Sequence, residues 1–267
     1  MSTVIYPSPI FGPIHSRRLG ISLGINLQPA DGKVCTFDCI YCECGFNKDH
    51  RPTLPRPSRE LVAQKLEEQL QKMVADKQLP DVLTFAGNGE PTAHPHFAEI
   101  IDDTIRLRNQ YCPHAKVCVL SNSTMIHRPE VHDALLRVDD NILKLDTVDP
   151  AYINKVDRPT GTYDVNNIIE GMKTFEGHII IQTMFMRGAM QRTDGNGQVT
   201  TESVDNTGEE FVGPWLEAVK AIRPQQVMVY TIDRETPAQG LEKASREQLD
   251  AIRDRVIAAG IACTASY

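Results

Sequence analysis

The feature that most constrains the fold is an alternation, repeated six times along the chain, of a short apolar run and a longer amphipathic pattern. The short runs are expected as strands at 20–27, 82–86, 116–120, 141–145, 178–185 and 226–232, with a last strand at 261–265. The longer patterns are expected as helices near 59–75 and 96–109, from Pro129, near 164–175, before Pro224 and near 246–259. Such alternation predicts a parallel sheet with right-handed crossovers. We therefore predict an α/β fold, a partial (β/α)6 TIM-type barrel, although a doubly wound sheet stays open.

The chain is predicted to be a single domain, residues 1–267, because no repeat or linker interrupts the series. Residues 1–19 precede the first expected strand as an N-terminal extension. Residues 187–210 form a long polar segment after the fifth strand, which we interpret as a lid or substrate loop rather than a disordered one. Ligands of parallel α/β folds bind at the carboxyl ends of the strands, so the loops that follow the strands are the expected site.

The composition indicates a cytoplasmic protein with no membrane anchor. No run approaches the roughly 18 apolar residues of a membrane helix, and the N-terminus lacks the pattern of a secretory signal. Clustered cysteines in that reducing compartment favour metal binding or catalysis over disulfides. A net charge of −7 argues against general attraction to phosphate backbones, although basic residues near the cysteines leave a local patch open.

Three cysteines spaced Cys35-x3-Cys39-x2-Cys42 follow directly on the first expected strand, and Cys44 comes shortly after them. A zinc site would need a further cysteine pair at finger spacing, and a thioredoxin-like pair would leave Cys35 unexplained. An iron–sulfur cluster uses all three thiolates. Three ligands on a [4Fe–4S] cluster leave one iron open to a cofactor. Random placement of the chain's cysteines predicts only about 0.005 copies of this spacing.

A second motif, Gly87-Asn88-Gly89-Glu90-Pro91, ends the second expected strand. Glycines let a ligand approach the backbone, and a carboxylate accepts hydrogen bonds from an ammonium group. With Tyr41 just before the last cysteine, the two motifs together resemble those of radical S-adenosylmethionine (SAM) enzymes. The family's Gly-Gly-Glu motif is interrupted or shifted here by Asn88. The resemblance covers nearly the whole chain, because the family's partial (β/α)6 barrel carries its cluster loop after the first strand.

The resemblance implies roles for individual residues. The expected cluster ligands are Cys35, Cys39 and Cys42. The residues expected to contact SAM are Tyr41, Gly87, Gly89, Glu90, Ser121, Lys144, Asp146, Gln182 and Tyr230. Arg158 is a candidate clamp for an anionic substrate group, since a guanidinium binds such groups bidentately. The alternative for the strand-end side chains is a polar group satisfied by its neighbours. His94 and His96, beside the glycine motif, are expected at the surface or in a helix cap, and their location leaves a substrate role open.

The resemblance also implies an activity: reductive cleavage of SAM at a [4Fe–4S] cluster, giving a 5′-deoxyadenosyl radical that abstracts hydrogen from an unidentified small-molecule, RNA or protein substrate. An external one-electron reductant of the flavodoxin or ferredoxin type is the implied partner. The stretches GPIHSRRLGISLGINLQP, GNGEPT and VDRPTG further resemble the branch related to wyosine-base synthases, although no cysteine precedes Cys35 to bind a second cluster. Two alternatives stay open: an activase of a glycyl-radical enzyme, and an electron-transfer module with Cys44 as fourth ligand.

Overall fold

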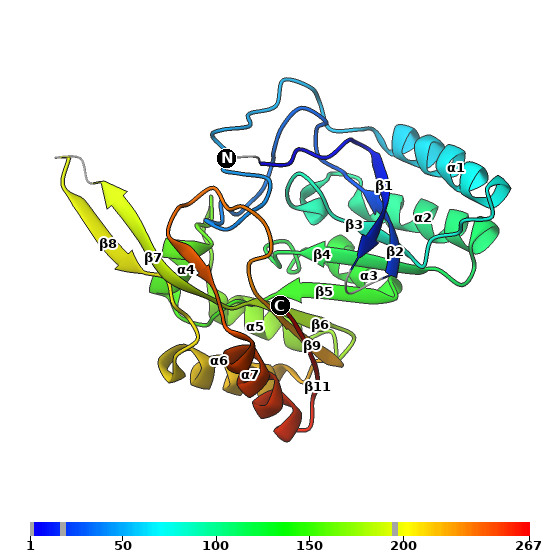
Figure 1. Cartoon of the computed structure of the whole chain (residues 1–267). Helices are drawn as coiled ribbons and strands as arrows, with labels where there is room; N and C mark the ends of the chain where they lie inside the picture. The colour runs from blue at the N-terminus through cyan, green and yellow to red at the C-terminus, as the bar shows by residue number, and fades with distance from the viewer. Residues whose placement is uncertain (1–2, 17–19, 194–196) are drawn as a thin grey trace. The chain divides into compact units, whose positions relative to one another are not determined.

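The computed structural model describes residues 3–16, 20–193 and 197–267 (Figure 1). The chain divides into two compact units. We call them the amino unit, which comprises Ile5–Thr36 and Asn47–Leu143, and the carboxyl unit, which comprises Met1–Val4, Phe37–Phe46 and Lys144–Tyr267. The cysteine segment is divided between them in sequence, since Cys35 belongs to the amino unit and Cys39 and Cys42 to the carboxyl unit.

The amino unit contains a sheet whose strands follow one another in chain order. They are β1 (Ile10–Ser16), β2 (Gly20–Ile25), β3 (Val82–Phe85), β4 (Lys116–Ser121) and β5 (Asp140–Lys144), the last of which ends at the unit boundary. From β2 to β5 all pairs are parallel, with Ser22 opposite Val82 and Val82 opposite Lys116. The parallel arrangement predicted for these strands is therefore confirmed.

The helices of the amino unit follow the apolar periodicity of the sequence. They are α1 (Arg59–Ala75), α2 (Phe97–Tyr111) and α3 (Pro129–Arg137), with a short 3-10 turn, η1, at Pro91–Ala93. In α1 the side chains spaced along one face are buried: Val62, Leu66, Leu70 and Met73. The Ser58 hydroxyl caps this helix by accepting a hydrogen bond from the Leu61 N–H. α2 packs against both α1 and α3, so these helices form one layer.

Strand β1 lies within the segment 1–19, which we expected to be a plain extension. It pairs antiparallel with β2, with Ile10 opposite Ile25, and the register shifts between Phe11 and Ile14. Pro13 lies in that irregularity, where a missing N–H is tolerated at a sheet edge. Glycine and proline inside the run hid the strand from its sequence pattern. Residues 17–19 of the extension lie outside the described part of the chain.

The carboxyl unit continues the βα alternation. Its parallel strands are β6 (Ile180–Met184), β9 (Gln226–Tyr230) and β11 (Ala262–Ser266), with β9 paired to both others. Its helices are α4 (Pro150–Val156), α5 (Val165–Lys173), α6 (Glu209–Ile222) and α7 (Arg246–Ala258). Helix α4 was not predicted, because seven residues are too few to show a clear period. Helix α5 begins at the expected cap, Asp164, whose side chain accepts from the Asn166 N–H.

The predicted polar loop 187–210 contains a β-hairpin, so the expectation of an irregular loop is wrong for its strand residues 187–193 and 199–203, whereas the lid or substrate role stays a prediction. β7 (Met186–Thr193) pairs antiparallel with β8 (Val199–Ser203) and with β10 (Leu241–Lys243), and the hairpin is yellow in Figure 1. Most of β8 is exposed. A strand pair without a buried face needs no apolar alternation, so its residues carry no strand signal. Residues 194–196 of the predicted loop lie outside the described residues.

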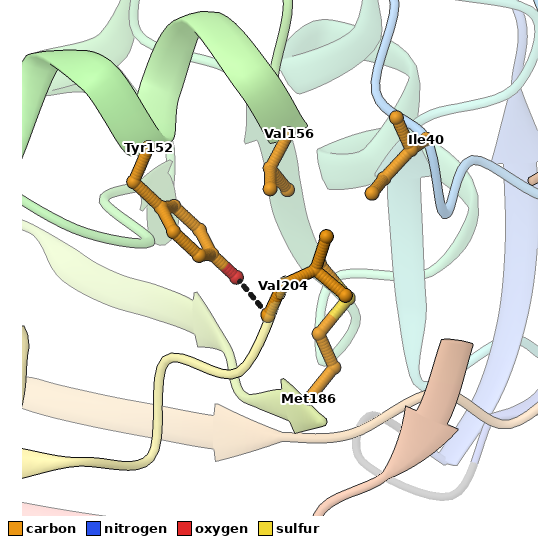
Figure 2. Packing of buried hydrophobic residues seen from close by; sticks show 5 residues of the cluster. All are labelled: Ile40, Tyr152, Val156, Met186 and Val204. Carbon is orange, nitrogen blue, oxygen red and sulfur yellow. Dashed lines mark hydrogen bonds between the residues drawn. The ribbon is translucent and has the colours of Figure 1, made fainter. Parts of the chain in front are cut away.

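One hydrophobic cluster in the carboxyl unit anchors the cysteine segment. Figure 2 shows Ile40, from between Cys39 and Cys42, packed with the buried side chains of Tyr152, Val156, Met186 and Val204. The Tyr152 hydroxyl donates to the Val204 carbonyl at 2.7 Å. Because Met186 opens β7 and Val204 follows β8, the base of the hairpin and the cysteine segment share one core.

Candidate functional site

Cys39 and Cys42 lie on a tight turn in the carboxyl unit. The Cys42 N–H donates to the Cys39 carbonyl at 3.2 Å, so the backbone turns back between the two thiols. The Ile40 N–H donates to the Val156 carbonyl at 2.9 Å, which ties this turn to the end of α4. Both thiols are reduced and partly exposed. Backbone hydrogen bonds and the Ile40 anchor therefore position these two sulfur atoms.

Cys35 is positioned by the glycine motif within the amino unit. Val34, the residue before it, forms a parallel β-bridge with Gly89. The Val34 N–H donates to the Asn88 carbonyl at 2.9 Å, and the Glu90 N–H donates to the Val34 carbonyl at 3.3 Å. The two sequence motifs that carried the family resemblance are therefore in direct backbone contact.

Both glycines of this motif adopt backbone angles that favour glycine. Gly87 has φ of +121° and Gly89 has φ of +136°. A Cβ atom on Gly89 would lie 1.9 Å from the Val34 carbonyl oxygen, and one on Gly87 would lie 2.8 Å from the Asn26 side chain. The glycines let the motif pack against the chain itself. Their predicted contact with SAM remains a prediction.

Asn88, which separates the glycines, is fully buried, and its side chain hydrogen-bonds to backbone groups of two other segments. Its Oδ1 accepts from the Tyr6 N–H at 2.8 Å. Its Nδ2 donates to the carbonyls of Tyr6 and Pro29, both at 2.9 Å. An asparagine at this place therefore fastens the start of the chain to the turn, which gives a physical reason for the departure from Gly-Gly-Glu.

Glu90 is buried and joins the ends of β3 and β4. Its Oε1 accepts from the Ser121 hydroxyl at 2.8 Å and from the Thr92 N–H at 3.0 Å, and its Oε2 accepts from the Asn122 N–H at 2.7 Å. Burial raises the pKa of Glu90, and these hydrogen bonds oppose that rise. The structure thus brings Glu90 and Ser121 together, as partners of each other. Their contact with SAM stays a prediction.

A buried charged cluster in the carboxyl unit brings together several predicted residues. The Lys144 ammonium lies 2.7 Å from a carboxylate oxygen of Asp146 and 2.7 Å from one of Asp157. It is also 3.5 Å from Cys39 Sγ and 4.5 Å from the centre of the Tyr41 ring. The Tyr41 hydroxyl contacts Lys144 and donates to Asp146. Tyr41 and Asp146, both predicted to contact SAM, therefore contact Lys144. This lysine also lies beside Cys39, a predicted cluster ligand.

The charges in this cluster are unequal, with one ammonium between two carboxylates. Burial raises the pKa of Asp157 to about 6, with Lys144 opposing the rise and Asp146 adding to it. Burial alone would lower the pKa of Lys144, but the carboxylates of Asp146 and Asp157 raise it well above its ordinary value. Lys144 therefore stays protonated and binds both acidic side chains at neutral pH.

The remaining predicted residues differ in their placement. Tyr230, at the end of β9, lies close enough to Lys144 to raise the pKa of that lysine. Gln182 is half-buried on β6. Arg158 is exposed, and its guanidinium lies 5.0 Å from the centre of the Phe46 ring. The structure therefore places Tyr230 within electrostatic range of Lys144 and stacks Arg158 on an aromatic ring.

Two residues beside predicted ones were missed. Asn122 directly follows Ser121, and its Nδ2 lies 3.6 Å from Cys35 Sγ. Asp157 directly precedes Arg158 and binds Lys144. Asn122 could have been found from its place just after a predicted strand, whereas no local pattern indicates that Asp157 meets a lysine on another element.

The donor set fits an iron–sulfur cluster, because three reduced thiols occupy one short segment and thiolates are the ligands such clusters prefer. Within residues 3–16, 20–193 and 197–267, no three His, Cys, Asp or Glu side chains are grouped as a metal site. The assignment of the three ligands therefore rests on their spacing and on the family described below.

His94 is buried rather than at the surface, and it is the C-cap residue of η1, as the capping alternative predicted. Its Nε2 contacts the Pro57 carbonyl at 3.0 Å, and its Nδ1 accepts from the His96 N–H at 3.1 Å. The acceptor role of Nδ1 leaves the proton on Nε2, which donates to Pro57. Burial lowers the pKa of His94. The prediction about His96 stands, since it is exposed and occupies the cap position of α2.

Replacing His94 by Gln should destabilise the protein by about 1 kcal/mol at neutral pH, because a buried hydrogen bond is lost. The folded state of the native protein binds fewer protons at His94 than the unfolded state does, so its stability falls as pH drops below the unfolded pKa of about 6.5. The His94→Gln variant has no imidazole to titrate at this position, so its stability does not fall for this reason at low pH. Thermal unfolding should therefore show a smaller gap between native protein and variant at about pH 5.5 than at about pH 7.5. A gap that widens at low pH contradicts the neutral, buried assignment.

Comparison with known proteins identifies the class. The sequence profile described as the Radical SAM superfamily matches residues 31–189, more than half of the chain. The chain therefore belongs to the radical SAM superfamily, and the predicted enzyme class is confirmed. Members of this superfamily use a [4Fe–4S] cluster and SAM, so the predicted cofactors are confirmed with it.

Individual relatives agree with this family. A UPF0026 protein of Helicobacter pylori is 33% identical over 68% of this chain, and the chain spans 58% of that relative's length. A radical SAM methyltransferase from Sphaerobacter thermophilus matches with a TM-score of 0.64 at 13% identity, over 92% of this chain and 66% of that one. SuiB from Streptococcus suis, bound to S-adenosylmethionine, matches with a TM-score of 0.62 at 13% identity, over 91% of this chain and 50% of that one. These structural matches confirm the predicted α/β fold of the partial TIM-barrel type.

Among the described residues, none of the helices combines the length and apolar composition needed to cross a membrane.

Proposed function

We propose that this protein cleaves SAM reductively at a [4Fe–4S] cluster held by Cys35, Cys39 and Cys42, and uses the resulting 5′-deoxyadenosyl radical to abstract hydrogen from a substrate. The observation that carries the proposal is the Cys-x3-Cys-x2-Cys spacing, which lies inside the matched segment 31–189. Val34, the residue before the first of these cysteines, forms a β-bridge with Gly89 of the glycine motif. When bound, the cluster and SAM supply the electron transfer and the C–S bond cleavage.

The chain's own residues hold and orient these groups in the proposal. Lys144, Asp146 and Tyr41 form a hydrogen-bonded set beside Cys39, and they offer both donors and acceptors to the polar groups of SAM. Tyr230 and Gln182 add polar side chains at neighbouring strands. Support for these contacts comes from the proximity of Lys144 to a cluster cysteine.

Gly87, Gly89, Glu90 and Ser121 fix the backbone around Cys35 in this proposal, and they also contact SAM. The glycine φ values and the hydrogen bonds of Glu90 support the positioning role. Arg158 remains a candidate for an anionic substrate group, because its exposed guanidinium can leave the Phe46 face for a carboxylate or phosphate.

Radical SAM enzymes in general depend on an external reductant. For this chain we propose a flavodoxin- or ferredoxin-type donor in the cytoplasm. The substrate is a small molecule, an RNA or a protein.

The test is anaerobic reconstitution with iron and sulfide, followed by SAM and dithionite. Native protein should form 5′-deoxyadenosine, and Cys35→Ala, Cys39→Ala and Cys42→Ala should each lower its formation at least about a thousandfold, since each removes a cluster ligand. Product formation that survives these changes contradicts the ligand assignment.

Cys44→Ser is the matched control. Cys44 is buried, and it lies two residues after Cys42 in the sequence. Its replacement therefore measures the effect of losing a thiol in this segment that is not a proposed cluster ligand. The proposal predicts that Cys44→Ser keeps both the cluster and 5′-deoxyadenosine formation. Loss of the cluster in Cys44→Ser would instead support the electron-transfer module with four protein ligands.

A further inference from the structure

The Asn122 side chain lies against the cysteine that the proposed function makes the first cluster ligand. Asn122 is buried, 8% exposed, just after β4. Its Nδ2 lies 3.6 Å from Cys35 Sγ and 2.8 Å from the Thr36 hydroxyl oxygen. An amide nitrogen carries two protons, so one N–H can donate to each of these atoms.

The orientation of this amide is fixed by its other partners. The Thr124 backbone N–H, which can only donate, lies 3.1 Å from Asn122 Oδ1, and the Thr124 hydroxyl donates to the same oxygen at 2.7 Å. A flipped amide would put two donors against each other there. The oxygen of Asn122 must therefore face Thr124, and its NH2 group must face Cys35.

The hydroxyl protons complete the same assignment. The Thr124 hydroxyl donates its only proton to Asn122 Oδ1. In its 2.7 Å contact with the Thr36 hydroxyl it must therefore accept, and Thr36 donates. Thr36 in turn accepts from Asn122 Nδ2. Asn122, Thr36 and Thr124 thus form a closed ring in which every hydrogen bond runs in one direction, and this ring leaves one N–H of the amide for Cys35.

The backbone of Asn122 is held as firmly as its side chain. Its N–H donates to Glu90 Oε2 at 2.7 Å, and Glu90 is itself fixed by Ser121 and Thr92. A donor held at both ends keeps its direction when the charge on the sulfur changes. Hydrogen bonds to cluster sulfur atoms stabilise the more negative, reduced state.

We propose that Asn122 is a positioning residue that raises the reduction potential of the cluster through an N–H···S hydrogen bond to Cys35. The inference rests on the proposed function, in that Cys35 must be a cluster ligand. It goes beyond that function by assigning one side chain to the control of electron entry from the reductant.

The test is the midpoint potential of the reconstituted cluster, measured by an electron paramagnetic resonance (EPR) titration without turnover. Asn122→Ala removes the donor and should lower the equilibrium constant for reduction about tenfold, a shift of about 59 mV to more negative potential. Asn122→Asp keeps the acceptor facing Thr124 and turns a carboxylate oxygen toward Cys35, so its potential should be lower still. Asn141→Ala, which removes a buried amide from β5, should leave the potential unchanged.

The assignment is supported if the midpoint potential falls from the native protein to Asn122→Ala and falls again to Asn122→Asp, at equal iron and sulfide content. A purely structural role of Asn122 gives no reason for this order of potentials. Equal potentials in loaded native protein and both variants overturn the inference and leave the proposed function intact. If either variant fails to load, the other supplies the comparison. Failure of the native protein to bind a cluster overturns the proposed function and this inference together.

Discussion

Gly89→Ala should destabilise the amino unit by about 3 kcal/mol or more, because it combines a strained backbone angle with an atomic overlap. The added Cβ would lie 1.9 Å from the Val34 carbonyl oxygen, which is backbone and cannot rotate away. The bridge that positions Cys35 must then open. We expect a lower melting temperature and a loss of bound iron after reconstitution.

Two glycines serve as matched controls. Gly260 has φ of +82°, and a Cβ added there would have no atom within 4 Å, so Gly260→Ala isolates the cost of the backbone angle. Gly161 also has open space around an added Cβ and lacks the positive angle, so Gly161→Ala should be nearly neutral. Thermal unfolding should rank the losses as Gly89, then Gly260, then Gly161. Equal losses for Gly89→Ala and Gly260→Ala would show that contact with Val34 is unimportant.

Lys144→Met should destabilise the protein by about 3 to 5 kcal/mol, because it leaves buried carboxylates without their counter-ion. The Asp146 side chain is 1% exposed and that of Asp157 is 4% exposed, so solvent cannot replace the ammonium. Chemical denaturation of the apoprotein measures this loss. Adding Asp157→Asn to Lys144→Met should recover part of it, since one buried charge is removed.

A surface lysine provides the comparison. Lys220 pairs with Glu217 on α6 where both side chains are well exposed, and Lys220→Met should cost only about 0.5 kcal/mol. If Lys144→Met is as mild as Lys220→Met, the lysine does not neutralise Asp146 and Asp157 in the folded protein.

Much of the fold was predictable because its strands are buried and its helices amphipathic. Helix α1 begins and ends where its apolar spacing predicted, and the Ser245 and Gln248 side chains form the capping box that opens α7. The strands that the sequence did not predict lack this apolar pattern. Strand β1 is interrupted by Pro13, and β8 has no buried face.

The site was predictable only as far as its residues are neighbours in sequence. The spacing of the cysteines and the glycine motif identify the class, and the structure adds that Val34 joins them. Pairings between distant segments had no local pattern. Asp157 meets Lys144, and Asn122 meets Cys35, only because α4 and the end of β4 bring them there.

The proposed function requires three thiolates that hold a cluster with one iron open to SAM. The most direct measurement is EPR spectroscopy of the reduced, reconstituted protein before and after SAM is added. We predict a signal from a [4Fe–4S] cluster whose shape changes on SAM binding, because the cofactor coordinates the iron without a protein ligand. A cluster signal that SAM leaves unchanged, or a protein that binds zinc instead, contradicts the account.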